Sequence, residues 1–259
     1  MLASKVLPEK YKKWNKKYGA PFGRLPKIKE ISHRSFYHKL SGPFSVQSNN
    51  TTREFEYPWA FFATTLGSGL RILEIGGGLS GFQFILDRIG CRVINADPGL
   101  DAKGKGWPCD SVTMTKLNCL FGTSVELRNT TVGKADLELE SFDRIFSISV
   151  LEHLSDEEIH NIMPIAFNLL KPGGYFIITL DLFLDVEPFT FEYKNKYGKN
   201  VNVKQLVERA PFVMVRGDRS ELNGYPEFDP ERIQNNLATY HKGSGYPALA
   251  QCVVLRKME

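Results

Sequence analysis

A glycine-rich segment, LEIGGGLSGFQFILDRIGCRVINAD at residues 73–97, constrains the fold of this chain more than any other feature. The apolar run LRILEI that leads into it is typical of a buried parallel strand. Ser80 can cap a following helix whose apolar residues recur at positions i, i+3, i+4 and i+7. A second apolar run, CRVINA, is followed directly by Asp97. Strand, glycine turn, helix and strand in this order predict one half of a doubly wound α/β sheet.

The remainder of the chain continues this alternation of strands and helices. We expect a helix at 111–121, a strand within 124–132 and a strand at FDRIFSIS. A helix then begins at the capping box Ser155–Glu158, is kinked by Pro164 and is stopped by KPGG. The next strand is YFIITL. The pattern is completed by a helix at 201–209, a strand at FVMVR, a helix at 229–240 and a strand within LAQCVVLRK. The chain therefore divides into an α/β domain at 67–259 and a basic, aromatic-rich helical preamble at 1–66 that caps the site.

The glycines and two acidic residues place a ligand site at the end of the first strand. Ligands of such sheets bind beyond the carboxyl ends of the strands, and glycines let the backbone approach them closely. Gly76, Gly78 and Gly81 fit the G-x-G-x-x-G spacing, and Asp97 stands where a carboxylate accepts hydrogen bonds from ribose hydroxyls. Glu74 disfavours a dinucleotide, because a carboxylate beside the loop would repel a pyrophosphate. It favours an adenosine cofactor with a positive group.

Four motifs together resemble the class I S-adenosylmethionine-dependent methyltransferases. They are LEIGGGLSG, INADP, SFDRIFSISVLEHL and LLKPGGYFIITL, in the order and spacing of that family, although Ser80 replaces a common third glycine. The resemblance implies a seven-stranded sheet of order 3-2-1-4-5-7-6 with the last strand antiparallel, and S-adenosylmethionine as cofactor. It also implies that the cofactor is held by Glu74, the backbone of Gly76, Gly77 and Gly78, Asp97, Ser147 and Ser149. The adenine-contacting segment aligns equally with Thr130–Thr131 or with Ala135–Asp136.

Candidates for the acceptor side come from the rim where the fourth and fifth strands end and the last strand begins. A general base is required only for a protonated acceptor, and His153 and His241 are the candidates for that role. Substrate-binding candidates are Tyr57, Trp59, Asp181 and Tyr240. Some relatives bind a metal through E-x-x-E-H, but Ser149 occupies the first position here, so we expect no metal. The acceptor is expected to be a small molecule or glycan that is methylated on oxygen or nitrogen.

Charge and cysteine usage limit the partners. Residues 1–40 hold eleven Lys or Arg against two Glu, a net +9 in a chain of net +4. This leaves RNA methylation as an alternative, although no RNA-binding module accompanies the basic arm. A non-catalytic cofactor-binding protein is a second alternative, and a dinucleotide oxidoreductase is disfavoured by Glu74. Four scattered cysteines and the lack of an apolar run of about 20 residues favour a cytoplasmic protein without a membrane partner.

Overall fold

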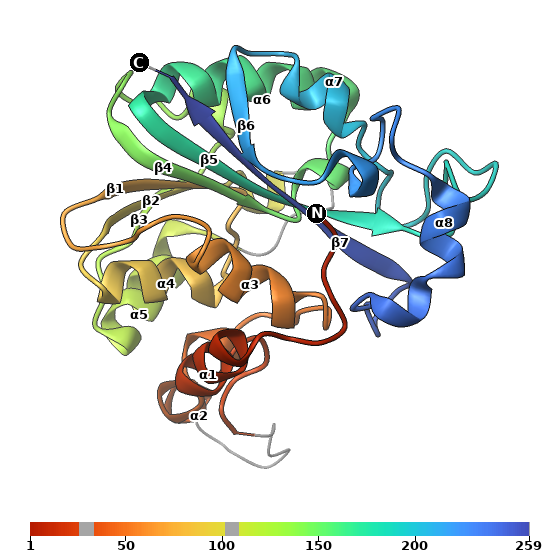
Figure 1. The fold of residues 1–259 in the computed structure, drawn as a ribbon. Helices are drawn as coiled ribbons and strands as arrows, with labels where there is room; N and C mark the ends of the chain where they lie inside the picture. Colours follow the sequence, from red (N-terminus) through yellow and green to blue (C-terminus); the bar gives the residue numbers. More distant parts are fainter. Residues whose placement is uncertain (26–33, 102–108, 259) are drawn as a thin grey trace.

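The computed structural model describes residues 1–25, 34–101 and 109–258. Its centre is a seven-stranded sheet of order β3-β2-β1-β4-β5-β7-β6. The strands β1 to β5 pair in parallel, and β7 is antiparallel to both β5 and β6. The sheet order and the antiparallel last strand that the resemblance implied are both confirmed (Figure 1).

The bounds of the strands and helices follow the chain. The strands are β1 Arg71–Ile75, β2 Arg92–Ala96, β3 Glu126–Arg128, β4 Phe142–Ile148, β5 Leu170–Phe183, β6 Phe212–Arg216 and β7 Ala248–Lys257. The helices are α1 Glu9–Tyr18, α2 Arg34–Ser41, α3 Arg53–Phe61, α4 Gly81–Arg88, α5 Ser111–Phe121, α6 Asp156–Leu169, α7 Val203–Val207 and α8 Pro230–Asn235.

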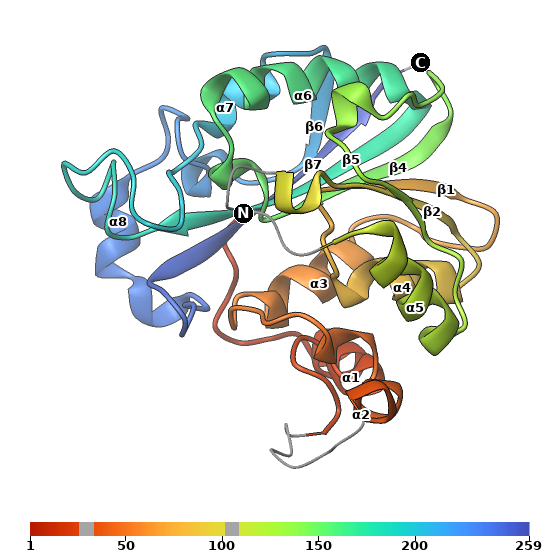
Figure 2. The same cartoon turned by 180° about the vertical axis from the view of Figure 1, so that it is seen from behind.

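Helices cover both faces of the sheet, as the two views of the ribbon show (Figures 1 and 2). On one face, residues of α1, α3, α4 and α5 share a buried cluster with side chains of β1, β4, β5 and β7. On the other face, α6 and α7 pack against the alternate side chains of the same strands. Each central strand is thus buried on both sides, which explains its continuous apolar sequence.

The local signals predicted the element boundaries well in the first two thirds of the chain. Ser80 accepts a hydrogen bond from the Phe82 amide, and the Ser155–Glu158 capping box is present. Helix α6 continues through Pro164 to Leu169. Strand β5 is longer than YFIITL, because Leu170 already pairs with Phe142 and the pairing resumes beyond a register shift. KPGG therefore lies within the strand rather than before it.

The helix expected at 229–240 is shorter in the structure, and the N-terminal segment explains the difference. Helix α8 ends at Asn235, and Leu237–Thr239 form a separate 3₁₀ turn. The Lys5 amide donates to the Thr239 carbonyl, and the His241 amide donates to the Ala3 carbonyl. Pairing with distant residues takes the backbone out of the helical path, a tertiary effect that local propensity does not contain.

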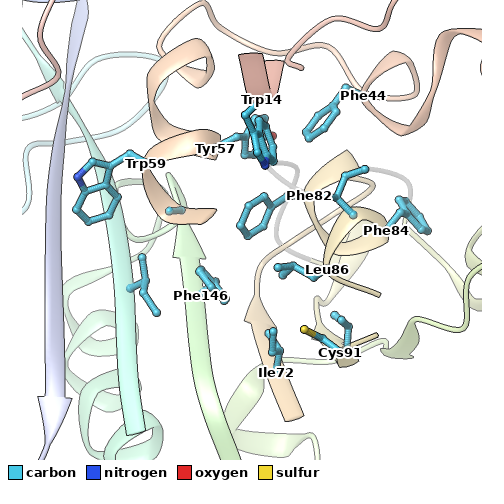
Figure 3. Packing of buried hydrophobic residues seen from close by; sticks show 14 of the residues in the cluster. Trp14, Phe44, Tyr57, Trp59, Ile72, Phe82, Phe84, Leu86, Cys91 and Phe146 are labelled. Atoms are coloured by element: carbon cyan, nitrogen blue, oxygen red, sulfur yellow. The ribbon is translucent and has the colours of Figure 1, made fainter. Parts of the chain in front are cut away.

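The first 66 residues contribute directly to the core. Tyr11 and Trp14 of α1 are buried, and the Trp14 ring contacts Phe44, Phe61 and Phe82 with centroid distances of 5.8, 5.3 and 6.4 Å. Figure 3 shows Trp14 and Phe44 beside Phe82 of α4. Aromatic packing therefore holds α1 on the α/β domain.

Candidate functional site

The glycine turn after β1 has a backbone that other residues would strain. Gly76 and Gly78 have φ angles of 69° and 53°, in the left-handed region. A Cβ atom on Gly76 would lie 2.6 Å from the Val150 side chain. The turn thus packs against the segment that follows β4, and the ends of β1 and β4 form one continuous surface.

Two side-chain carboxamides, those of Asn95 and Gln83, hold the glycine turn by hydrogen bonds, and the sequence analysis did not predict them. The Gly77 amide donates to Asn95 Oδ1 at 3.1 Å, and Asn95 Nδ2 donates to the Gly78 carbonyl at 3.0 Å. Gln83 Nε2 also donates to the Gly78 carbonyl, at 3.1 Å. Asn95 is a polar residue within an apolar strand, and this exception is the sequence feature that could have indicated its structural role.

Two carboxyl groups flank the turn. Asp97 Oδ2 accepts from the Gly78 amide at 2.7 Å, and its Oδ1 accepts from the Gly99 amide at 2.7 Å. Glu74 is 1% exposed, and its Oε2 has no hydrogen-bonding partner among the described residues. Burial, together with the nearby Asp97 charge, raises the pKa of Glu74 to about 8. A buried acid without a partner is costly, so this carboxyl is suited to a cationic ligand group.

A second polar group joins α3 to the ends of β4 and β5. Arg53 forms ion pairs with Glu56 and, at 3.6 Å, with Asp181. Glu56 Oε1 accepts from Ser149 Oγ at 2.7 Å and from Thr179 Oγ1 at 2.6 Å. Burial alone would raise the pKa of Glu56, but Arg53 and the two hydroxyls outweigh it and lower that pKa. Apart from the Arg53–Glu56 pair itself, the partners in this group lie far away in the sequence, so no local motif indicates it.

Two further carboxyls complete this group. Asp181 Oδ2 accepts from Tyr246 Oη at 2.5 Å, and the Asp181 amide donates to Glu152 Oε1 at 2.9 Å. Burial raises the pKa of Asp181 to about 6, even though Arg53 opposes the shift. Burial and the neighbouring Asp181 raise the pKa of Glu152 well above its usual range. One guanidinium thus pairs with two carboxyls, and a third, that of Glu152, accepts from the backbone of Asp181 beside them.

The two candidate histidines lie in different surroundings. His153 follows β4 in a short 3₁₀ turn, and its Nδ1 lies 2.5 Å from the Tyr197 carbonyl. The Tyr197 ring in turn contacts the Tyr246 ring, with a centroid distance of 4.3 Å. His241 Nε2 lies 2.9 Å from the Thr51 carbonyl and 3.9 Å from Glu54. The contacts therefore connect His153, through two tyrosines, to Asp181, whereas those of His241 lead to the start of α3.

The remaining candidates occupy more enclosed positions. Ser147 is buried, and its Oγ has no partner in the described part of the chain. Tyr57 and Trp59 are both buried, Tyr57 stacked on Phe82 and Trp59 beside β5 and β7 (Figure 3). Tyr240 packs in a cluster around Leu2 and Leu249. Tyr57, Trp59 and Tyr240 thus pack against apolar residues, and their part in acceptor binding stays a prediction.

Comparison with known sequences gives a family match over most of this region. A family model described as a methyltransferase domain matches residues 50–213, more than half of the chain. A ubiquinone biosynthesis O-methyltransferase from Bradyrhizobium sp. (strain ORS 278) is 29% identical over 113 residues, covering 43% of this chain and 40% of that protein. The corresponding protein of Cereibacter sphaeroides (strain ATCC 17029 / ATH 2.4.9) is 33% identical over 115 residues, with 42% and 40% coverage. The matches thus span about two fifths of these curated relatives.

Solved structures share the fold at low sequence identity. An S-adenosylmethionine-dependent methyltransferase from Mesorhizobium loti has a TM-score of 0.53 and 16% identity, covering 78% of this chain and 97% of that one. A cyclopropane synthase from Mycobacterium tuberculosis has a TM-score of 0.55 and 15% identity, with coverage of 87% and 95%. At this identity the likeness concerns the architecture of the sheet and its helices.

Proposed function

Because the chain belongs to the class I S-adenosylmethionine-dependent methyltransferases, we propose that it methylates a hydroxyl oxygen of a small-molecule acceptor. Its cofactor is S-adenosylmethionine. The observation that supports the choice of oxygen is the hydrogen bond between His153 Nδ1 and the Tyr197 carbonyl. A hydroxyl acceptor must lose a proton during transfer, and we propose that His153 takes it.

The glycine turn and its flanking carboxyls fit the cofactor. Gly76 and Gly78 adopt left-handed φ angles, which let the backbone turn sharply at the end of β1, as the cofactor loop of our proposal requires. Glu74 offers an oxygen, Oε2, without a hydrogen-bonding partner among the described residues, which is suited to the methionine ammonium. Asp97 is suited to the ribose hydroxyls. When bound, the cofactor supplies an activated methyl sulfonium.

The first prediction concerns Asp97. We expect Asp97→Ala to weaken binding of S-adenosylmethionine by about 1–3 kcal/mol, because a charge-assisted hydrogen-bonding partner is lost. Titration calorimetry on the full chain measures this change, with Asp101→Ala as a matched control on the exposed turn that follows. Unchanged affinity of Asp97→Ala would place the ribose elsewhere.

The hydrogen bond of His153 supports its proposed role as proton acceptor. The Tyr197 carbonyl can only accept, so Nδ1 of His153 carries the hydrogen. In the neutral ring Nε2 is then the nitrogen with the lone pair, which is the arrangement of a general base. Proximity and orientation of the acceptor can supply about 7–11 kcal/mol of the remaining barrier.

The charges around Asp181 indicate the kind of acceptor. Arg53 is already paired with Glu56 and Asp181, and the group carries more carboxyls than cations. An anionic acceptor would meet repulsion there, whereas hydroxyl groups can hydrogen-bond with Glu152 and Asp181. We therefore infer a neutral acceptor with more than one hydroxyl, such as a catechol or a sugar. The names of the O-methyltransferase relatives agree with methylation at oxygen.

Screening with methyl-labelled cofactor tests this function. We expect transfer to members of a panel of catechols and neutral glycosides, with no comparable transfer to their carboxylated analogues. Transfer to amines alone would favour the nitrogen alternative. Cofactor binding without transfer to any acceptor of the panel would favour a non-catalytic role.

A further inference from the structure

The helices α1 and α2, with residues 19–25 that follow α1, form a lobe on one side of the molecule. Both views show this α1–α2 lobe projecting from the body, on the opposite side from α6 and α7 (Figures 1 and 2). Hydrogen bonds join its parts. The Arg24 amide donates to the Ser41 carbonyl at 2.8 Å, and Tyr37 Oη donates to the Leu25 carbonyl at 3.1 Å. Arg24 and Leu25, which follow α1, thus lie against α2.

The outer surface of the lobe is strongly basic. Tyr11 and Trp14 of α1 face the core, which leaves the lysines of the helix on the outside. Exposed cations of the lobe include Lys12, Lys13, Lys16, Lys17, Arg24 and Lys39. Lys12 lies 3.8 Å from Glu9, the acid in the first turn of α1. Such a surface attracts anions.

The same lobe exposes large apolar side chains. Phe36 and Leu40, one helical turn apart on α2, are 58% and 47% exposed. Phe22 and Leu25 are 45% and 37% exposed, and Leu25 is held against α2 by Tyr37. Exposed apolar side chains are unfavourable in water, and their combination with lysines on one lobe is characteristic of a surface that enters a membrane interface.

We propose that the α1–α2 lobe docks on a bilayer that carries anionic phospholipids. The cations complement the negative surface of the leaflet, and the four apolar side chains enter the region between headgroups and acyl chains. RNA offers the same phosphate charge, but it offers no apolar phase for Leu25 and Leu40. In the described part of the chain no helix is long and apolar enough to span a bilayer. The proposed contact is with the bilayer surface. The length of the apolar runs in the sequence bears only on a spanning helix, so it does not test this contact.

Flotation of the full-length protein with lipid vesicles tests this proposal. We expect binding to vesicles of phosphatidylcholine and phosphatidylglycerol, and little binding to phosphatidylcholine alone. Binding should weaken when salt is raised from about 0.1 M to about 1 M, because the Debye length falls from about 10 Å to about 3 Å.

Two exposed-surface variants separate the two contributions. Lys12→Gln, Lys13→Gln and Lys16→Gln together should weaken vesicle binding about 100-fold, at about fivefold for each lysine near an anionic leaflet. Phe36→Ser with Leu40→Ser should weaken it at least about tenfold, because the apolar contribution is lost. Deleting residues 1–20 is a poorer test, since Tyr11 and Trp14 would be removed from the core.

A matched variant on a different surface controls for unspecific effects. It combines Phe191→Ser, Lys134→Gln and Lys194→Gln, all at exposed positions outside the lobe. This control should float as the wild type does, and all variants should bind S-adenosylmethionine with unchanged affinity. The proposal fails if the wild type does not float with anionic vesicles, if the control loses binding as the lobe variants do, or if polyuridylate binds at submicromolar concentration and the vesicles do not displace it.

Discussion

Replacing His153 with glutamine is expected to lower turnover by about 10²–10⁴-fold, the usual contribution of a positioned general base. Glutamine can preserve a hydrogen bond to the Tyr197 carbonyl, which the His153 Nδ1 makes at 2.5 Å. It cannot accept the acceptor's proton. The affinity for S-adenosylmethionine should change little, because in our proposal the glycine turn and its carboxyls hold the cofactor. Single-turnover rates with a hydroxyl acceptor from the screen, together with calorimetry, measure the two effects.

The pH dependence distinguishes a base from a merely structural histidine. If His153 takes the proton, the wild-type rate rises with pH through a histidine titration, and this rise is absent in His153→Gln. His160→Gln is the matched control, because His160 is outside the site and contacts Arg209. His241→Gln compares the second candidate directly. A loss below tenfold for His153→Gln, or an unchanged pH profile, would leave positioning alone as the source of catalysis.

The sequence predicted those parts of the site in which structure and chemistry are local. The glycine turn, the Ser80 cap and Asp97 lie within 25 consecutive residues, and the chain order of strands and helices follows from periodicity. The resemblance then supplied the sheet order, which periodicity alone does not contain. The structure confirms that order and the antiparallel β7.

The polar group around Arg53 could not be predicted, because it exists only after folding. Arg53 and Asp181 are separated by 128 positions, and Thr179 reaches Glu56 across 123. The α1–α2 lobe is a similar case. Only the folded chain shows that Phe36 and Leu40 remain outside while Tyr11 and Trp14 are inside. Helix α8 ends early for the same reason, a contact with the N-terminal segment.

Replacing Glu74 with glutamine is expected to stabilise the cofactor-free protein at neutral and higher pH. Burial and the Asp97 charge raise the pKa of the folded-state Glu74 to about 8, from a reference value of 4.5. Between these pH values the folded protein binds more protons than the unfolded chain, so the free energy of unfolding falls as the pH rises. The loss amounts to about 3 kcal/mol at pH 7, at about 1.4 kcal/mol for each pH unit above the reference value. Glutamine has no such titration.

Urea unfolding of the wild type and Glu74→Gln, from about pH 5 to about pH 8, measures this difference. The variant should gain stability relative to the wild type as the pH rises, whereas the exposed control Glu157→Gln should not. If the two curves stay parallel, Glu74 titrates as an ordinary surface acid and has no unusual cost.

The same carboxyl should make cofactor binding release a proton. An ammonium beside Glu74 favours its ionised form, so a group that is largely protonated at pH 7 in the free protein gives up its proton when the cofactor binds. Calorimetry in buffers of different ionisation enthalpy counts this proton. We expect close to one for the wild type and none for Glu74→Gln, which should also bind about 10–100-fold more weakly because a charge-assisted contact is lost. Glu74 would then destabilise the cofactor-free protein and strengthen cofactor binding, as expected of a residue whose role is to bind the ligand. Release of no proton by the wild type would remove Glu74 from the ammonium site, even if its stability profile behaved as expected.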